Sequence, residues 1–193
     1  DGDTLEEFQQ VLGDGLPLDS INASFHGLMA NYTESLGGST QCSIANSLWT
    51  DPEGRMQEDF VGRCSGIFDA QVFQEDLSAP VIVPALNSWV SDHTAGMIPQ
   101  IIQRPFGEDA AALMVNALYL KNTWAAKFDP SDTVTRDFTR ADGTAEPLDF
   151  LQHFSRSLTY LQSGSDEGVL LPYDDGRLGF FALLPDRDLD GWL

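Results

Sequence analysis

Apolar positions in the first hundred residues recur at steps of three and four, which is the spacing of one face of an α-helix. The clearest helical stretch is residues 18–36, and its apolar face consists of Leu18, Ile21, Phe25, Leu28, Met29, Tyr32 and Leu36. Asp19 and Ser20 are its candidate N-caps, and Gly37-Gly38 is its stop signal. The pattern predicts an amphipathic helix with one buried face.

Three further helices follow from the same spacing. The longest is predicted from Pro84, a residue suited to a first helical position, to a stop before Pro105. Its shared face consists of Leu86, Trp89, Val90, His93, Met97, Ile98, Ile101 and Ile102. Shorter helices are predicted over residues 4–12 and 56–68.

Other apolar stretches favour strands. Residues 42–49 and 70–73 predict two strands, and the nearly continuous apolar run 112–124 is typical of a buried central strand. In the second half of the chain, turn residues flanked by strand-like segments predict two β-hairpins. The first pairs 133–140 with 144–151 around Asp142-Gly143, and the second pairs 169–173 with 178–184 around Asp174-Asp175-Gly176. Helices followed by hairpins predict an α+β fold with mixed, largely antiparallel sheets.

Composition agrees with one folded unit. The chain has 193 residues, 42% of them hydrophobic, which is enough to bury a core, and no linker or repeat divides it, so we expect residues 1–193 to form one domain. The net charge of −20 repels phosphate backbones, and we therefore expect no nucleic-acid partner. The longest apolar run, residues 110–120, is too short to cross a bilayer, so no membrane span is expected.

The sequence offers few metal or redox motifs. We interpret Cys42 and Cys64 as two buried thiols, with a single disulfide as the alternative. Residues 186–191 match part of a calcium-binding EF-hand loop, but they follow a predicted strand and lack the closing Glu. The histidines form no zinc-binding pair; they are His26, His93 and His153. We expect no metal and no cofactor.

Enzymatic motifs are equally sparse. No GxSxG nucleophile turn occurs, and no glycine-rich phosphate loop is formed by Gly13, Gly15, Gly37 and Gly38. Because a catalytic triad is defined by geometry rather than by sequence, a hydrolase stays open as an alternative, but we expect no enzyme. Asn22 and Asn31 begin N-glycosylation sequons inside a predicted helix, where chance occurrence is the simpler interpretation.

Four segments carry a more specific signal. They are LNSWVSDHTAGMI at 86–98, VNALYLKNTW at 115–124 followed by Phe128, IANSLW at 44–49, and LLPY at 170–173 with LLP at 183–185. In the same order, they resemble the "IN-x-WV-x-x-x-T-x-GKI", "VNA-x-YFKG-x-W…F", "ANxLF" and "LPY…LP" motifs of the serpin family of protease inhibitors. The chain departs from these motifs at Met97, Leu120 and Asn122, where the family has Lys, Phe and Gly.

The resemblance implies a suicide inhibitor of serine or cysteine proteases. In that family the protease cleaves an exposed reactive-centre loop, becomes acylated, and is carried along as the loop inserts into the main sheet. The strand at 112–124 would form one wall of the gap that receives the loop, with Asn116 controlling sheet opening and Trp124 where the loop first enters. Without the resemblance, these two are a buried amide bonded to backbone and a core tryptophan.

The same resemblance assigns four residues to a helix that packs across the main sheet: Asn87, Trp89, Thr94 and Gly96. The chain resembles only the middle of a serpin domain, and the resemblance places the first helices, the closing strands and the reactive-centre loop outside it. We therefore expect a partial domain whose uncovered sheet edges are covered by a C-terminal fragment of the same protein or by self-association. An extracellular or cell-surface location is also implied. The alternative function is a serpin-like binding or structural module without inhibitory activity.

Overall fold

The computed structural model describes residues 2–34, 40–52, 54, 56–153 and 158–186. Its contacts divide the chain into two compact units. The first comprises Asp1–Leu36 and Gln41–Leu120, and the second comprises Gly37–Thr40 and Lys121–Leu193. Each unit is described by itself.

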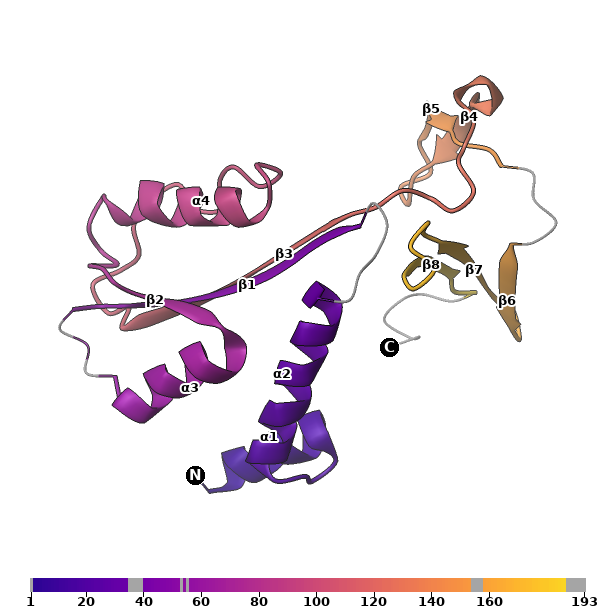
Figure 1. Cartoon of the computed structure of the whole chain (residues 1–193). Helices are drawn as coiled ribbons and strands as arrows, with labels where there is room; N and C mark the ends of the chain where they lie inside the picture. Colours follow the sequence, from indigo (N-terminus) through magenta and orange to yellow (C-terminus); the bar gives the residue numbers. More distant parts are fainter. Residues whose placement is uncertain (1, 35–39, 53, 55, 154–157, 187–193) are drawn as a thin grey trace. The chain divides into compact units, whose positions relative to one another are not determined.

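The first unit contains the helices that the apolar spacing predicts (Figure 1). They are α1 (Asp3–Gly13), α2 (Leu18–Glu34), α3 (Glu58–Phe68) and α4 (Ile82–His93). The N-caps predicted for α2 are wrong, because the helix begins at Leu18, and Asp19 and Ser20 lie in its first turn. The backbone N–H groups of Ser20 and Ile21 donate to the carbonyl of Pro17, which starts the helix earlier. The predicted stop at Gly37-Gly38 lies outside the described residues.

Helix α4 is shorter than the apolar spacing predicts. It ends at His93 instead of continuing to residue 104. Ala95 and Gly96 adopt positive φ angles of 50° and 76°, and the N–H of Gly96 bonds back to the carbonyl of Ser91. This left-handed turn terminates the helix, and Pro99, which lacks an N–H donor, follows it.

The sheet of the first unit has the order β2-β1-β3. Its strands are β1 (Gln41–Thr50), β2 (Ala70–Gln74) and β3 (Ala112–Lys121). Strands β1 and β2 are parallel. Asp51 N–H donates to the carbonyl of Ala111, and the side chain of Asn116 reaches Ala45 and Asn46, so β3 runs antiparallel to β1.

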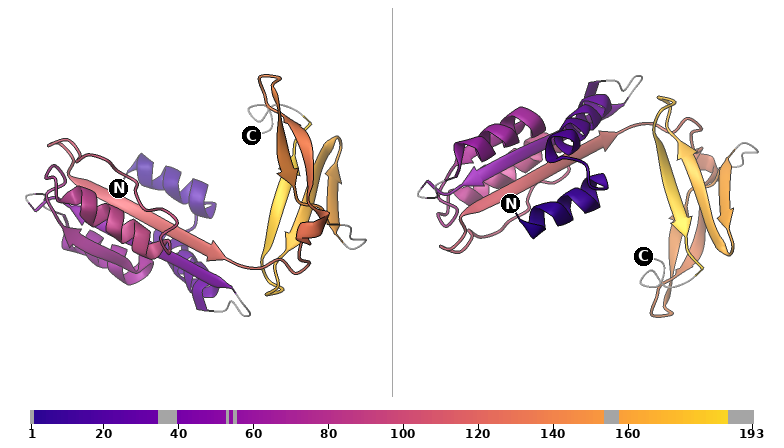
Figure 2. Two further views of the ribbon diagram at one scale, coloured as in Figure 1. Left: turned by 90° about the horizontal axis from the view of Figure 1, so that it is seen from above. Right: turned by 90° about the horizontal axis from the view of Figure 1, so that it is seen from below.

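The prediction of a buried central strand at 112–124 is wrong for this structure. Strand β1 is central, β3 lies at the edge of the described sheet, and Ala117 is the one buried residue of β3. A continuous apolar run predicts cover on both faces. Here α4 covers one face of the sheet, and α3 lies on the other (Figures 1 and 2). Helix α3 packs against β2, however, and Met114 and Leu118 of β3 remain exposed.

The core of this unit lies between α4 and the sheet. Its buried members are Trp49, Leu77, Ile82, Leu86, Trp89, Val90 and Ala117. Trp49 stacks on Phe73 of the neighbouring strand, with 4.2 Å between ring centroids. Large aromatic and branched side chains of this kind supply most of the free energy gained by burial.

The second unit consists of hairpins, as the turn signals predict. Strand β4 (Val134–Thr139) pairs with β5 (Ala145–Phe150), after a short 3-10 turn at Pro130–Asp132. Strands β6 (Thr159–Ser163), β7 (Asp166–Pro172) and β8 (Gly179–Leu184) form an antiparallel sheet in that order. Strand β6 was not predicted because its five residues include only two large apolar ones. The α+β class with mixed, largely antiparallel sheets is confirmed.

Candidate functional site

Strand β3 carries Asn116, to which the serpin resemblance assigns control of sheet opening. The Asn116 side chain is exposed, and its Nδ2 donates to Asn46 Oδ1 at 2.8 Å and to the carbonyl of Ala45 at 3.4 Å. Asn46 Nδ2 in turn donates to the carbonyl of Phe68 at 2.7 Å. The interpretation as a buried amide bonded to backbone is therefore wrong, because the side chain is exposed and its shorter bond goes to the side chain of Asn46. Two amides connect β3 through β1 to the end of α3.

The outer edge of β3 is unpaired among the described residues. Its side chains alternate: Leu113 and Val115 pack against the core beneath α4, whereas Met114 and Leu118 are 73% and 60% exposed. An unpaired edge presents N–H and C=O groups that can bond to another extended segment. This edge is the one part of the described first unit with a geometry suited to strand addition next to the predicted residue Asn116.

The four residues assigned to the helix lie in α4 or in the turn after it. Trp89 is buried, and its Nε1 donates to Gln71 Oε1 on β2 at 2.8 Å. Asn87 accepts from the backbone N–H groups of Ile101 and Ile102 and donates to the carbonyl of Ile102, so it fastens the returning loop to the helix.

The other two residues terminate the helix. The buried hydroxyl of Thr94 donates to the carbonyl of Val90 at 2.8 Å and accepts from the N–H of Ile98 at 3.1 Å. Gly96 supplies the left-handed turn, with φ of 76°. These contacts have a structural role, which is to end α4 and fix the loop that follows it.

Trp124 belongs to the second unit and is half-buried. It stacks on Tyr173, with 4.8 Å between centroids, and contacts Phe128 and Phe180 edge-on. The N–H of Ala125 donates to the carbonyl of Pro172 at 3.0 Å. The segment that follows β3 is thereby docked on the β7–β8 hairpin, and Trp124 is the centre of that contact.

A polar cluster beside Trp124 was missed by sequence reasoning. The carboxylate of Asp175 accepts from Thr40 Oγ1 at 2.7 Å and from Asn122 Nδ2 at 2.8 Å. Bonds from the N–H groups of Leu178 and Arg177, together with Thr40 and Asn122, lower the pKa of Asp175 from 3.8 to about 2. The one signal in the sequence was that Asn122 stands where the serpin motif has Gly; nothing pointed to Thr40.

The remaining candidates do not assemble into a site. Cys42 and Cys64 are free thiols, so the disulfide alternative is wrong, and both are half-buried rather than fully buried; burial raises the pKa of each. His26 bonds to the carbonyl of Ile67, and His93 bonds to the carbonyl of Trp89 and stacks on its ring. His153 contacts Phe128 edge-on.

The calcium motif at 186–191 lies outside the described residues except for Asp186. Within the described part of the chain, no group of three or more His, Cys, Asp or Glu side chains is arranged to hold a metal ion. The sequon residues Asn22 and Asn31 lie inside α2, as expected. Among the helices that the structure describes, none combines the length and apolar character that a membrane span requires.

Comparisons with known proteins agree with the sequence motifs. A family model described as Serpin (serine protease inhibitor) matches residues 1–192. Serpin-Z10 of Arabidopsis thaliana is 30% identical over 152 residues, which cover 75% of this chain and 39% of the relative. Serine protease inhibitor 42Dd of Drosophila melanogaster is 26% identical over 196 residues, covering 99% of this chain and 52% of the relative. The chain thus spans about half the length, or less, of these relatives.

The fold agrees with a solved structure. The thermophilic serpin tengpin in the latent state superposes with a TM-score of 0.84 at 23% identity, over 100% of this chain and 52% of that one. At this identity the likeness concerns the fold alone.

Proposed function

Because the chain belongs to the serpin family, we propose that the protein containing it is a serine-type endopeptidase inhibitor that acts by loop cleavage and insertion. The nucleophilic oxygen of the protease attacks the scissile carbonyl carbon of the reactive loop. The amide nitrogen leaves with a proton as a new amine, and the loop remains bound to the protease as an ester. Insertion of the cleaved loop then carries the acylated protease with it. For a cysteine protease the bond is a thioester.

The unpaired outer edge of β3 is the observation that carries this proposal. The strand is ten residues long and has one face packed beneath α4, so an added strand would gain a row of backbone hydrogen bonds without displacing the core. The exposed side chains Met114 and Leu118 would pack beside such a strand. The inserting loop is expected from the segment that the resemblance places beyond Leu193.

Asn116 and Trp124 have separate roles in this proposal. Asn116 bonds β3 to β1 through Asn46, which supports a role in the resistance of the sheet to opening. Trp124 lies three residues after the end of β3 and is stacked on Tyr173, which supports a role where the loop first enters. The target is a serine or cysteine protease outside the cell or at its surface.

The first measurement is the denatured intact mass of every polypeptide in the purified sample. A second, smaller chain beside this one would identify a cleaved inhibitor and direct the assay to the uncut protein. A single species of 193 residues would direct the assay to a longer polypeptide that includes the segment after Leu193.

The functional test is a denaturant-resistant complex. The uncut protein is incubated with trypsin-like, chymotrypsin-like, elastase-like and papain-like proteases, and the products are separated after boiling in detergent. We expect a one-to-one covalent complex with at least one protease, and none with the same protease blocked at its nucleophile. Cleavage of the loop by every protease without complex formation would overturn the proposal in favour of a non-inhibitory binding module.

A further inference from the structure

One carboxylate in the second unit binds two segments that are distant in the sequence. Asp175 lies in the turn between β7 and β8, and its Oδ2 accepts from Thr40 and Asn122, which are 135 and 53 residues away. Thr40 immediately precedes β1, and Asn122 immediately follows β3. The same oxygen therefore binds the segment that leads into one strand and the segment that leaves the other.

The cluster fixes all three side chains. Asp175 Oδ1 accepts from the backbone N–H groups of Arg177 and Leu178, each at 2.9 Å, so its own turn orients the carboxylate. Asn122 Nδ2 also donates to Thr40 Oγ1 at 2.7 Å, and Asn122 Oδ1 accepts from the N–H of Thr123 at 2.8 Å. Hydrogen bonds to an ionised carboxylate are stronger than those between neutral groups.

The two residues that follow Asn122 each contact the same hairpin. Thr123 Oγ1 bonds to the carboxylate of Asp174, and the N–H of Asp174 donates to the carbonyl of Thr123 at 2.9 Å. Trp124 then stacks on Tyr173. The Asp175 cluster thus lies at the beginning of the contact that places the Trp124 ring.

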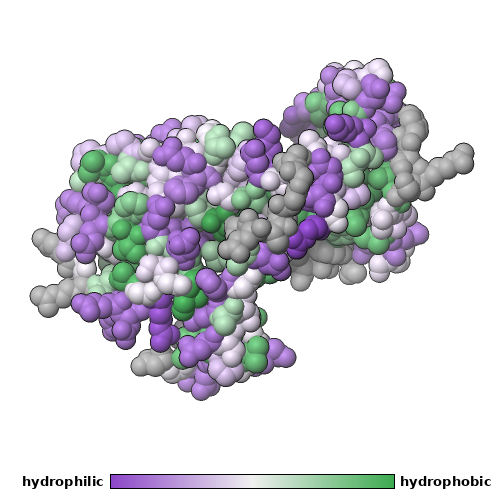
Figure 3. Space-filling view, viewed as in Figure 1, coloured by the Kyte–Doolittle hydropathy of each residue, from purple (hydrophilic) through white to green (hydrophobic). Residues whose placement is uncertain are grey.

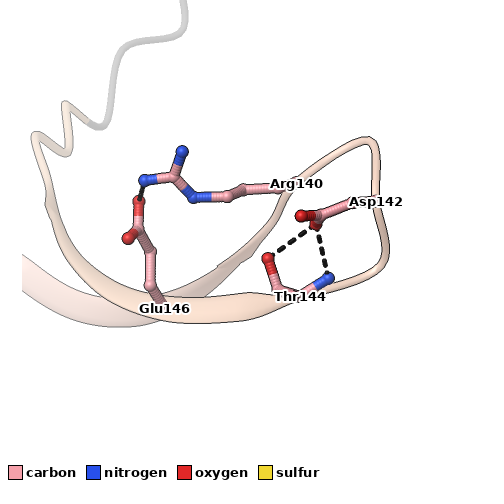
Figure 4. Close-up of polar contacts among 4 residues, drawn as sticks. All are labelled: Arg140, Asp142, Thr144 and Glu146. Carbon is pink, nitrogen blue, oxygen red and sulfur yellow. Dashed lines mark hydrogen bonds and ion pairs between the residues drawn. The ribbon is translucent and has the colours of Figure 1, made fainter.

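A second aspartate shows what a hairpin turn requires by itself. Asp142, between β4 and β5, accepts from the N–H and the hydroxyl of Thr144 at 2.9 and 2.6 Å, both only two residues away (Figure 4). Arg140 and Glu146 close this hairpin with an exposed ion pair. Because local bonds suffice to shape that turn, the bonds from Asp175 to Thr40 and Asn122 serve something other than the turn.

We propose that Asp175 is a positioning residue that holds the Trp124 segment against the β7–β8 turn and links it to Thr40. The part of this inference that concerns what Trp124 does in inhibition rests on the proposed function. The part that concerns where Asp175 holds Trp124 does not.

The test is ¹⁹F NMR of the chain labelled with 5-fluorotryptophan. The four tryptophans should give four resonances, and the one that Trp124→Phe removes belongs to Trp124. We expect Asp175→Ala to shift and broaden the Trp124 resonance, while those of Trp49 and Trp89, in the core of the first unit, stay in place. Asp175→Asn, which keeps one carbonyl acceptor, should give a smaller shift.

Two comparisons keep the test falsifiable. Asp142→Ala removes the equivalent local bonds in the other hairpin and should leave the Trp124 resonance unchanged. Thr40→Val and Asn122→Ala each remove long-range bonds without touching the turn, so they should shift the Trp124 resonance even if Asp175→Ala fails to fold. An unchanged Trp124 resonance in these two variants, or an equal shift in Asp142→Ala, would overturn the inference.

The role in inhibition is tested separately in the uncut protein. There Asn122→Ala should raise by several-fold the number of inhibitor molecules consumed for each protease molecule trapped, because the loop would first enter beside a misplaced Trp124. If the Trp124 resonance shifts but no variant, nor the parent, forms protease complexes, the proposed function fails and the positioning role of Asp175 stands. If complexes form equally well with the variant, the link to inhibition is wrong.

Discussion

At the scale of single residues, the two amides that connect β3 to α3, Asn46 and Asn116, should contribute differently to the stability of the fold. Asn46 makes two side-chain bonds, to Asn116 and to the carbonyl of Phe68, whereas the exposed amide of Asn116 can bond to water when its partner is lost. We expect Asn46→Ala to lower the free energy of unfolding by about 1–2 kcal/mol and Asn116→Ala by about 0.5–1 kcal/mol.

Urea unfolding of both single variants and the double variant checks this prediction. The double variant should lose less than the sum of the two, with a coupling of about 0.5–1 kcal/mol, because the shared bond is removed only once. Strictly additive losses would show that the contact between the two amides contributes nothing to stability.

The lowered pKa of Asp175 predicts a pH dependence of defined sign. Its pKa is about 2 in the folded chain, below its ordinary value of 3.8. The folded state therefore favours the ionised form of Asp175. The resulting stabilisation of the folded chain is present above pH 3.8 and is lost as the pH falls towards 2. We expect the difference in urea midpoint between the parent and Asp175→Asn to be largest above pH 4 and to shrink on acidification to pH 2.

Titration of the Asp175 carboxyl carbon by NMR measures the same effect directly. Asn122→Ala removes one donor, so it should move the titration of Asp175 to higher pH. A midpoint difference between parent and Asp175→Asn that stays constant down to pH 2 would contradict the assigned bonds.

At the scale of elements, the sequence predicted what periodicity determines and missed what single polar side chains determine. The apolar spacing located α1 to α4, and the turn residues Asp142-Gly143 located the β4–β5 hairpin. The same spacing extended α4 to residue 104, because Ile98, Ile101 and Ile102 continue the helical pattern. The helix ends earlier because Thr94 and Asn87 bond the loop backbone, and no hydrophobic pattern encodes such bonds.

The candidate site was predictable to a similar extent. The serpin motif at residues 115–124 identified Asn116 and Trp124, because the family has the same residue types at the same spacing. The Asp175 cluster joins Thr40, Asn122 and Asp175 across 135 residues, and such an arrangement is visible only after folding. The open edge of β3 was not predicted for another reason: its apolar run is typical of a covered central strand, whereas β3 lies at the edge of the described sheet with Met114 and Leu118 exposed.

The end of α4 gives a prediction at this scale. Gly96 has φ of 76° with no atom near the position of a Cβ, so Gly96→Ala is opposed by backbone strain alone. We expect it to lower the free energy of unfolding by about 1 kcal/mol. Gly27 lies inside α2, also with open space at its Cβ, so Gly27→Ala is a matched control that should stabilise by up to about 1 kcal/mol. Thermal unfolding should show shifts of opposite sign, and two shifts of equal sign would contradict the assigned helix end.

At the scale of the whole molecule, two features oppose each other. The net charge of −20 repels other copies of the chain. Yet large apolar side chains are exposed on the described residues, including Met114 and Leu118 on β3, and Figure 3 shows hydrophobic side chains at the surface among hydrophilic ones. Strand β3 has no charged residue before Lys121, and natural edge strands commonly use charges to prevent pairing with another chain.

This balance predicts salt-dependent self-association of the isolated chain through the edge of β3. At 0.1 M, added salt screens the repulsion between charges that are more than about 10 Å apart, but it leaves backbone pairing and apolar contact intact. The weight-average mass in sedimentation velocity should therefore rise with salt. Leu118→Lys places a charge on the edge strand and should lower that mass at every salt concentration. Val11→Lys makes the same change in net charge at an 81% exposed position on α1 and should have a much smaller effect. Equal effects of the two variants would show that net charge, and not the β3 edge, controls association.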